Sequence, residues 1–238
     1  MIVALAAGIS LAAAGCGPDG PAATSIDTGS IAGSGVPIEP QGVAAATVRL
    51  RSVGCGPRTE LGTGTVIEHG LVITAAHVVA GSDHVTVAAP GGNEIATDVV
   101  LFDPDLDLAV LRLPTPISDV ATLRAEPANE GEQGLVATVT SEGVIELIEV
   151  EVLRTVTVRT TDIYRAADVE RPGFEIDAAI EPGDSGAMVH LPGGGVGVVW
   201  SRSTVNADRA WAADLPPVLQ ADDEWRSLTT AVDTGPCL

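Results

Sequence analysis

The 238-residue sequence contains no lysine, so its 12 basic residues are all arginines, set against 32 acidic residues. The formal net charge is −20 with the four histidines neutral. Proteins that bind nucleic acids hold the phosphate backbone with clustered Lys and Arg, so this balance argues against a nucleic-acid partner. It argues equally against membrane contact through a polybasic segment.

Aromatic residues are also scarce, at 3% of the chain, whereas apolar residues reach 45% and charged residues 18%. The apolar content comes mainly from Val, Ala, Leu and Ile, and it excludes a disordered chain. The length allows one or two compact units with a sizeable core. There are three cysteines, and an odd count in a secreted chain leaves one thiol over.

The first 15 residues are almost wholly apolar and are predicted to form a lipoprotein-type signal peptide. The run is short for a membrane span, which needs about 20 residues, but it fits the apolar region of a secretory signal. The small residues AAG at 13–15 and then Cys16 resemble a bacterial lipobox, in which the Cys carries the lipid. Ordinary cleavage, or a buried helix with an incidental Cys16, is the alternative.

Residues 16–42 are rich in Gly, Pro, Ser, Thr and Ala without apolar periodicity, which predicts a flexible tether. From residue 43 onward, short runs rich in Val, Ile, Leu and Thr alternate with Gly, Pro and Asp clusters. Such regular short runs predict an all-β protein. The predicted strands are residues 46–51, 64–67, 71–74, 85–88, 95–101, 108–113, 135–140, 144–158, 174–178, 187–190, 196–200 and 209–212.

About a dozen strands are too many for one small barrel, so we predict two antiparallel β-barrels of about six strands each. The division should lie near residues 114–131, which are rich in Pro, Glu and Asn as interdomain connectors are. Helical turns are predicted only at 75–79 and at 215–220, where two prolines open the second turn. The two halves show no internal sequence repeat.

Three segments carry residues suited to nucleophilic catalysis. TAAHVV at 74–79 places His77 on a short turn after an apolar strand, and DLAVL at 107–111 places Asp107 at the head of another. GDSG at 183–186 places Ser185 in a tight, Gly-bounded turn. A Ser hydroxyl needs an adjacent base, which a His supplies near neutral pH, and a buried carboxylate keeps the imidazole in the correct tautomer.

The chain order His, Asp, Ser is that of chymotrypsin-type enzymes and differs from that of subtilisins and α/β-hydrolases. GTG at 62–64, DIY at 162–164 and GPC at 235–237 add to the likeness. From residue 43 to 238, the sequence therefore resembles the chymotrypsin-like (trypsin-fold) serine proteases. Within that family it looks most similar to actinobacterial envelope proteases of the mycobacterial membrane-anchored acid-resistance protease type.

The resemblance implies a double six-stranded antiparallel β-barrel, with a short C-terminal helical turn, that works as a serine endopeptidase without a cofactor. It makes Ser185 the nucleophile, His77 the general base and acid, and Asp107 the carboxylate that orients His77. The backbone N–H groups of Gly183 and Ser185 become the oxyanion hole. No metal is expected, because the acidic residues at 103 and 105 lack the spacing of an EF-hand loop and read as loop acids.

The sequence departs from the family pattern around the nucleophile. Ala187 stands where the family usually has a second Gly, and no Ile-Val-Gly-Gly segment is present. Asp184 is therefore expected to cap local N–H groups rather than to pair with a freed terminal amine. The family's primary-pocket floor falls on Ala179, which predicts cleavage after a small or apolar residue. Trp200 lies near the same pocket, and a role in its wall or in the core is preferred over direct contact.

The remaining cysteines and histidines receive structural predictions. Cys55 and Cys237 are expected to form a disulfide, since an exported chain occupies a disulfide-permissive compartment; two free thiols are the alternative. His69 and His84 are expected at the surface, and His190 is expected to be structural.

The predicted protein is an enzyme of the cell envelope, anchored by its lipid or secreted, and acts on protein or peptide substrates. It is expected to be monomeric. Two other functions fit the same residues. A protease-fold protein could bind peptides with little or no turnover, and the same triad would permit hydrolysis of small esters.

Overall fold

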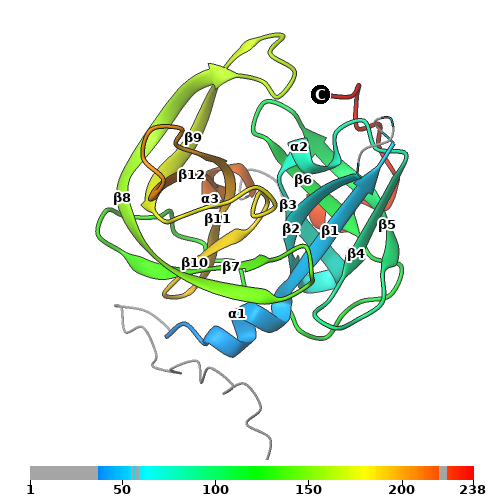
Figure 1. Cartoon of the computed structure of the whole chain (residues 1–238), viewed down its shortest axis with the longest axis horizontal. Coiled ribbons are helices and arrows are strands. Elements are labelled where there is room, and N and C mark those ends of the chain that lie inside the picture. Colours follow the sequence, from blue (N-terminus) through cyan, green and yellow to red (C-terminus); the bar gives the residue numbers. More distant parts are fainter. Residues whose placement is uncertain (1–36, 55, 57–58, 220–223) are drawn as a thin grey trace, which may run out of the picture.

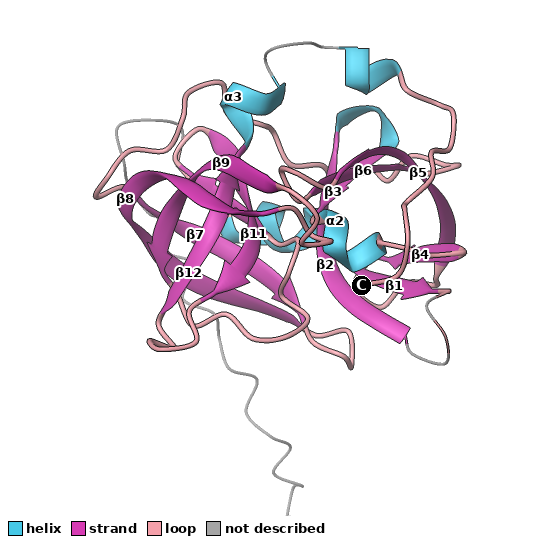
Figure 2. Ribbon diagram, turned by 90° about the horizontal axis from the view of Figure 1, so that it is seen from above, coloured by secondary structure: helices cyan, strands magenta, loops and turns pink. Residues whose placement is uncertain are grey.

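The computed structural model describes residues 37–54, 56, 59–219 and 224–238. The predicted signal peptide, Cys16, Cys55 and most of the predicted tether lie outside these residues. The described chain forms two closed, six-stranded antiparallel barrels that stand side by side (Figure 1). Strands dominate both halves and the helices are short (Figure 2). The predicted fold class is therefore confirmed.

All twelve predicted strands are present. The first barrel consists of β1 (Thr47–Val53), β2 (Thr59–Ile67), β3 (Leu71–Thr74), β4 (His84–Ala88), β5 (Ile95–Asp103) and β6 (Leu108–Arg112). The second consists of β7 (Gln133–Val139), β8 (Ile145–Thr161), β9 (Asp168–Asp177), β10 (Met188–Leu191), β11 (Gly194–Arg202) and β12 (Arg209–Asp214). The helices are α1 (Pro40–Ala46), α2 (Ala76–Val79) and α3 (Leu215–Leu219), with 3₁₀ turns η1 (Glu68–Gly70) and η2 (Glu224–Ser227).

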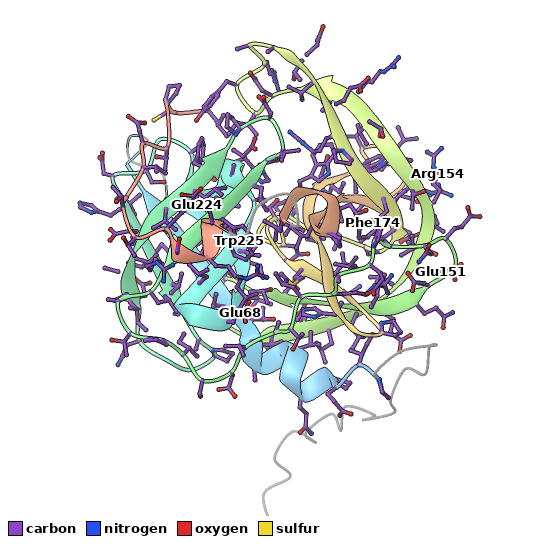
Figure 3. All side chains as sticks on the ribbon, turned by 180° about the vertical axis from the view of Figure 1, so that it is seen from behind. Glu68, Glu151, Arg154, Phe174, Glu224 and Trp225 are labelled. Carbon is purple, nitrogen blue, oxygen red and sulfur yellow. The ribbon has the colours of Figure 1, made fainter. Side chains whose placement is uncertain are left out.

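Each barrel has its own apolar core of alternating inward side chains. Phe174 is fully buried in the second barrel, whereas Trp225 from η2 packs onto the core of the first (Figure 3). Residues 113–132 connect the barrels. Arg124 holds this connector, because its Nη1 and Nη2 both bond the carboxylate of Glu132 at 2.9 Å.

The tether prediction fails at its C-terminal end. Helix α1 begins at Pro40, a residue favoured in the first turn of a helix, so the expected boundary between residues 42 and 43 falls inside it. Ile38 and Val43 pack with Leu135 and Ala137 on the second barrel, which is why this segment is folded. Figure 1 shows α1 lying beneath the barrels. Among the described helices, none is long and apolar enough to cross a membrane.

Candidate active site

The imidazole of His77 is held by Asp107, and both residues belong to connecting segments of the first barrel, one after β3 and the other just before β6. β3 ends at Thr74 and α2 then turns His77 toward the start of β6. The Nδ1 atom lies 3.0 Å from Oδ1 and 2.9 Å from Oδ2 of Asp107, and the His77 backbone N–H also donates to Oδ1 at 2.9 Å. The buried carboxylate thus favours the tautomer with a proton on Nδ1, which leaves Nε2 able to accept a proton.

Asp107 adopts a left-handed backbone conformation, with φ at 56°. Asp and Asn are among the non-glycine residues that tolerate this region best. The loop before it is shaped by Asp103, whose Oδ1 accepts the N–H groups of Asp105 and Leu106 at 3.0 and 2.9 Å. Asp103, at the end of β5, thus stabilises the turn, and Asp107 faces the imidazole.

The nucleophile turn starts with a tight bend. The N–H of Asp184 donates to the carbonyl of Glu181 at 3.1 Å, with Pro182 second and Gly183, at φ 104°, third. This is the residue order of a type II turn. One carboxylate oxygen of Asp184 accepts the Glu181 N–H at 2.8 Å, which is a local cap. Burial raises the pKa of Asp184, while hydrogen bonds from Glu181 and Thr138 oppose this shift.

Two N–H groups of this turn remain available. The N–H groups of Asp184 and Gly186 donate to backbone carbonyls. Within the described part of the chain, those of Gly183 and Ser185 donate to no protein group. A Cβ atom placed on Gly183 would meet nothing within 4 Å, so the space beside it is open. Free N–H groups beside open space are what a developing oxyanion requires.

Thr63 on β2 joins the first barrel to the nucleophile turn of the second. Its hydroxyl donates to the Gly183 carbonyl at 3.0 Å, and its N–H donates to the Ser185 carbonyl at 2.9 Å. Its own carbonyl accepts the hydroxyl of Thr74 at 2.8 Å. The sequence offered only the GTG motif as a signal for this residue. Among the described contacts, no hydrogen bond joins Ser185 to the His77 imidazole.

A cavity of about 500 Å³ opens beside Gly183. Ala179 lines it, as do the acidic residues Glu60, Glu146 and Glu181. Of the described residues that line this cavity, none is Trp200, whose ring instead covers the guanidinium of Arg171 at 4.3 Å. The structure therefore places Trp200 outside the cavity that Ala179 lines.

Arg171 was missed by sequence reasoning, because it lies outside the predicted strand at 174–178, and a charged residue outside a strand is expected at the surface. Its side chain is buried and lies 3.9 Å from Asp107. Of the other histidines, His84 is exposed at the start of β4 and His190 is buried on β10. The side chain of His69 lies outside the description. No group of three or more potential metal ligands occurs among the described residues.

A carboxylate-held imidazole and a Gly-bounded serine, carried by two six-stranded barrels, define the architecture of a chymotrypsin-like serine protease. The family profile of the trypsin-like peptidase domain matches residues 62–196. The chain therefore belongs to the trypsin-like peptidase family.

Individual proteins similar to this chain are also serine proteases. The serine protease Rv3671c of Mycobacterium tuberculosis is 33% identical over 203 residues, covering 81% of this chain and 49% of the relative. The crystal structure of its active form is 30% identical with a TM-score of 0.76, covering 83% of this chain and 88% of that one. The HtrA-type protease AlgW with a tripeptide has a TM-score of 0.65 at 22% identity, covering 79% and 63%, which shows the shared fold. The chain spans about half the length of its curated relative Rv3671c.

Proposed function

We propose that this chain is an exported serine endopeptidase that hydrolyses peptide bonds of cell-envelope proteins through an acyl-enzyme. The observation that carries the proposal is the two-oxygen contact of Asp107 with Nδ1 of His77. The available N–H groups of Gly183 and Ser185 support it, as does membership of the trypsin-like peptidase family.

In this mechanism, Ser185 Oγ attacks the carbonyl carbon of the scissile bond while His77 Nε2 takes its proton. The carbonyl oxygen becomes an oxyanion that accepts hydrogen bonds from the N–H groups of Gly183 and Ser185, each worth about 3–4 kcal/mol in the transition state. The imidazolium, stabilised by Asp107, then protonates the leaving nitrogen as the C–N bond breaks. Water attacks the acyl-enzyme by the same route and restores Ser185.

A fluorophosphonate probe tests the assignment of the nucleophile, because it reacts only with an activated serine. We expect the wild type to be labelled and Ser185→Ala to be unlabelled, while Ser118→Ala, a change at an exposed loop serine, keeps the labelling. A folded wild type that takes up no label would instead support a peptide-binding protein with little or no turnover. The alternative is tested because no hydrogen bond joins Ser185 to His77 among the described contacts.

Comparison of casein with a simple ester distinguishes the peptidase from a hydrolase of small esters. We expect casein to be cleaved, and cleavage to be lost together with labelling in Ser185→Ala. Hydrolysis of the ester alone would contradict the endopeptidase assignment.

The substrate class is proposed to be protein or peptide, as the tripeptide complex of the similarly folded AlgW suggests. Ala179, which is uncharged and lines the cavity beside Gly183, supports cleavage after small or apolar residues. The carboxylates of Glu60, Glu146 and Glu181 in the same cavity favour cationic groups elsewhere on the substrate. A peptide library whose dominant cleavage follows Arg would contradict the pocket assignment.

The location is proposed from residues outside the structural description. Lipidation at Cys16 would anchor the enzyme at the envelope, and Cys16→Ser should release it into the soluble fraction while Ser25→Ala should not. Release of neither variant from membranes would contradict the anchor. A disulfide between Cys237 and Cys55 is proposed as well, because an exported chain occupies a disulfide-permissive compartment. A monomer is proposed, and size-exclusion chromatography with light scattering tests it.

A further inference from the structure

Arg171 occupies an unusual place for a charged residue. It lies on β9 of the second barrel with only 2% of its surface exposed, among the largest fully buried side chains of the described protein. Burying a guanidinium requires partners that replace its water. Those partners come from the first barrel and from β11.

The guanidinium reaches across to the loop that carries Asp107. Its Nε and Nη2 both donate to the backbone carbonyl of Asp105, at 3.0 and 2.8 Å. Its Nη1 lies 3.9 Å from Oδ2 of Asp107, and its flat face lies on the ring of Trp200 at 4.3 Å. One side chain of β9 thus joins the loop of the triad acid in the first barrel to β11 of the second.

The charges around Arg171 come from one side. Burial lowers its pKa from the usual value, and the negative charges of Asp107, Asp103 and Asp105 oppose that shift. All three belong to the first barrel, because Asp103 ends β5 and both Asp105 and Asp107 lie in the loop between β5 and β6. Arg171 therefore stays charged in a dry setting in which Coulomb interactions are stronger than in water.

The loop needs such a support because Asp107 lies in the left-handed region at φ 56°. From the end of β5, Asp103 accepts the N–H groups of Asp105 and Leu106 in the loop. From the second barrel, the N–H of Ile163 donates to the Pro104 carbonyl at 3.2 Å, and Arg171 binds the next carbonyl along the chain. The two barrels together thus fix the conformation that points Asp107 at His77.

We propose that Arg171 is a positioning residue of the catalytic apparatus, which sets the orientation and the local field of Asp107 from the opposite barrel. This inference rests on the proposed function of the triad. Arg171 acts on Asp107 in two ways. The two hydrogen bonds to Asp105 fix the loop, and the positive charge moderates the pull of Asp107 on a proton at His77.

Two substitutions separate these two effects. Arg171→Lys keeps the charge but cannot reproduce the planar fork, so kcat should fall about 10- to 100-fold through misplacement of Asp107, with KM within about twofold. The acid limb of the kcat/KM profile should stay in place. Arg171→Met removes the charge as well, so the imidazolium is stabilised more strongly and the acid limb should move to higher pH, by about half a unit or more.

Arg159→Met is the matched control, because Arg159 is 85% exposed on β8 and pairs with exposed Glu170. It should leave kcat, KM and the profile unchanged. Folding of each variant is verified by circular dichroism and thermal melting, and if Arg171→Met does not fold, the kcat of Arg171→Lys decides.

Wild-type kcat and an unmoved profile in a folded Arg171 variant would overturn the inference. So would a loss confined to KM, which would assign Arg171 to substrate binding. Failure of the proposed function itself is distinguishable, because the wild type would then not be labelled by the fluorophosphonate probe.

Discussion

At the scale of single residues, the candidate site is assembled from both barrels and joined by a few hydrogen bonds. His77 and Asp107 belong to the first barrel, and Ser185 belongs to the second. Thr63 crosses between them with its hydroxyl on the Gly183 carbonyl and its N–H on the Ser185 carbonyl. The conformation of the nucleophile turn therefore depends on a first-barrel side chain.

Thr63→Val tests that dependence, since it removes the hydroxyl at nearly constant shape. The Gly183 carbonyl would lose its partner, and the N–H of Val139, which donates to the same hydroxyl at 3.3 Å, would lose its acceptor. We expect the free energy of unfolding to fall by about 1–3 kcal/mol. We also expect kcat to fall about tenfold or more as the oxyanion hole loses its preorganisation. Urea unfolding and steady-state kinetics measure the two effects.

Thr65→Val supplies the control for this prediction on the same strand. The Thr65 hydroxyl is buried without a hydrogen-bond partner in the described structure, so its removal should be neutral or slightly stabilising. Equal losses in the two variants would show that the hydroxyl of Thr63 has no special role.

The difference between the predicted and the unpredicted site residues has a physical origin. His77, Asp107 and Ser185 were found because each combines a reactive group with a local setting visible in the sequence. Arg171 and Thr63 act through partners more than 60 residues away in the chain. Such contacts arise only when the two barrels pack against each other, so the sequence of one chain does not reveal them.

At the scale of elements, the neighbouring strands β10, β11 and β12 carry two buried ionisable groups that respond to pH in opposite ways. Burial lowers the pKa of His190 on β10 to about 4, and its Nε2 has no partner within the described structure. Burial raises the pKa of Asp214 at the end of β12 to about 6, against the opposing effects of the Ala128 N–H and Arg124. Each group is therefore neutral over part of the range in which its unfolded counterpart is charged.

How each group changes the stability as the pH falls depends on whether the folded or the unfolded chain binds its proton first. As the pH falls from about 6.5 to 4, the unfolded chain protonates His190 before the folded one, so stability is lost. As the pH falls from about 6 to 4, the folded chain protonates Asp214 first, so stability is gained. The two contributions, each of roughly 1–3 kcal/mol, should largely cancel in the wild type.

Single substitutions should expose the two contributions. Relative to wild type, His190→Gln should gain stability as the pH falls from 7 to 4.5, whereas Asp214→Asn should be most stabilised at pH 7 and lose that advantage by pH 4.5. Urea unfolding across this range measures both, with His84→Gln, at the exposed first residue of β4, as the control. Parallel pH curves for all four proteins would rule out the assigned titrations.

The strands were more predictable than the helices for a related reason. Alternating or continuous β-branched runs bounded by turn residues identify a strand locally. The sequence at α1, PQGVAAA, gives less than two turns of a helix, and too few apolar positions to show a period of 3.6 residues. Only packing of Ile38 and Val43 onto Leu135 and Ala137 selects the helix, and that packing is a tertiary effect.

At the scale of the whole molecule, the two barrels have the same strand connectivity without any sequence repeat. The first closes in the order β1-β2-β3-β6-β5-β4 and the second in the order β7-β8-β9-β12-β11-β10. Two such units leave the candidate site at their junction, so the geometry of that site depends on the relative placement of the barrels. Contacts that span the junction are therefore expected to matter more for catalysis than for the stability of either barrel.

The C-terminal segment provides one such contact. The N–H of Val232 donates to the Val99 carbonyl of β5 at 2.9 Å, and the Thr234 carbonyl accepts the N–H of Gly81 at 3.0 Å. The same Thr234 carbonyl accepts the hydroxyl of Tyr164 at 2.7 Å. Tyr164 follows Ile163, which bonds the loop of Asp107. The tail thus links the first barrel to the β8–β9 hairpin of the second.

Reduction of the proposed Cys55–Cys237 disulfide should therefore lower both stability and activity. The bridge would close a loop of about 180 residues, and removal of such a constraint typically costs about 2–5 kcal/mol. The freed tail would also loosen its hold on Tyr164, so kcat should fall before the protein unfolds. Thermal melting and kinetics with and without reductant measure this, and Cys237→Ser should behave like the reduced wild type. Cys16→Ser should leave both quantities unchanged, and unaltered melting with thiols shown to be free would refute the proposed bridge.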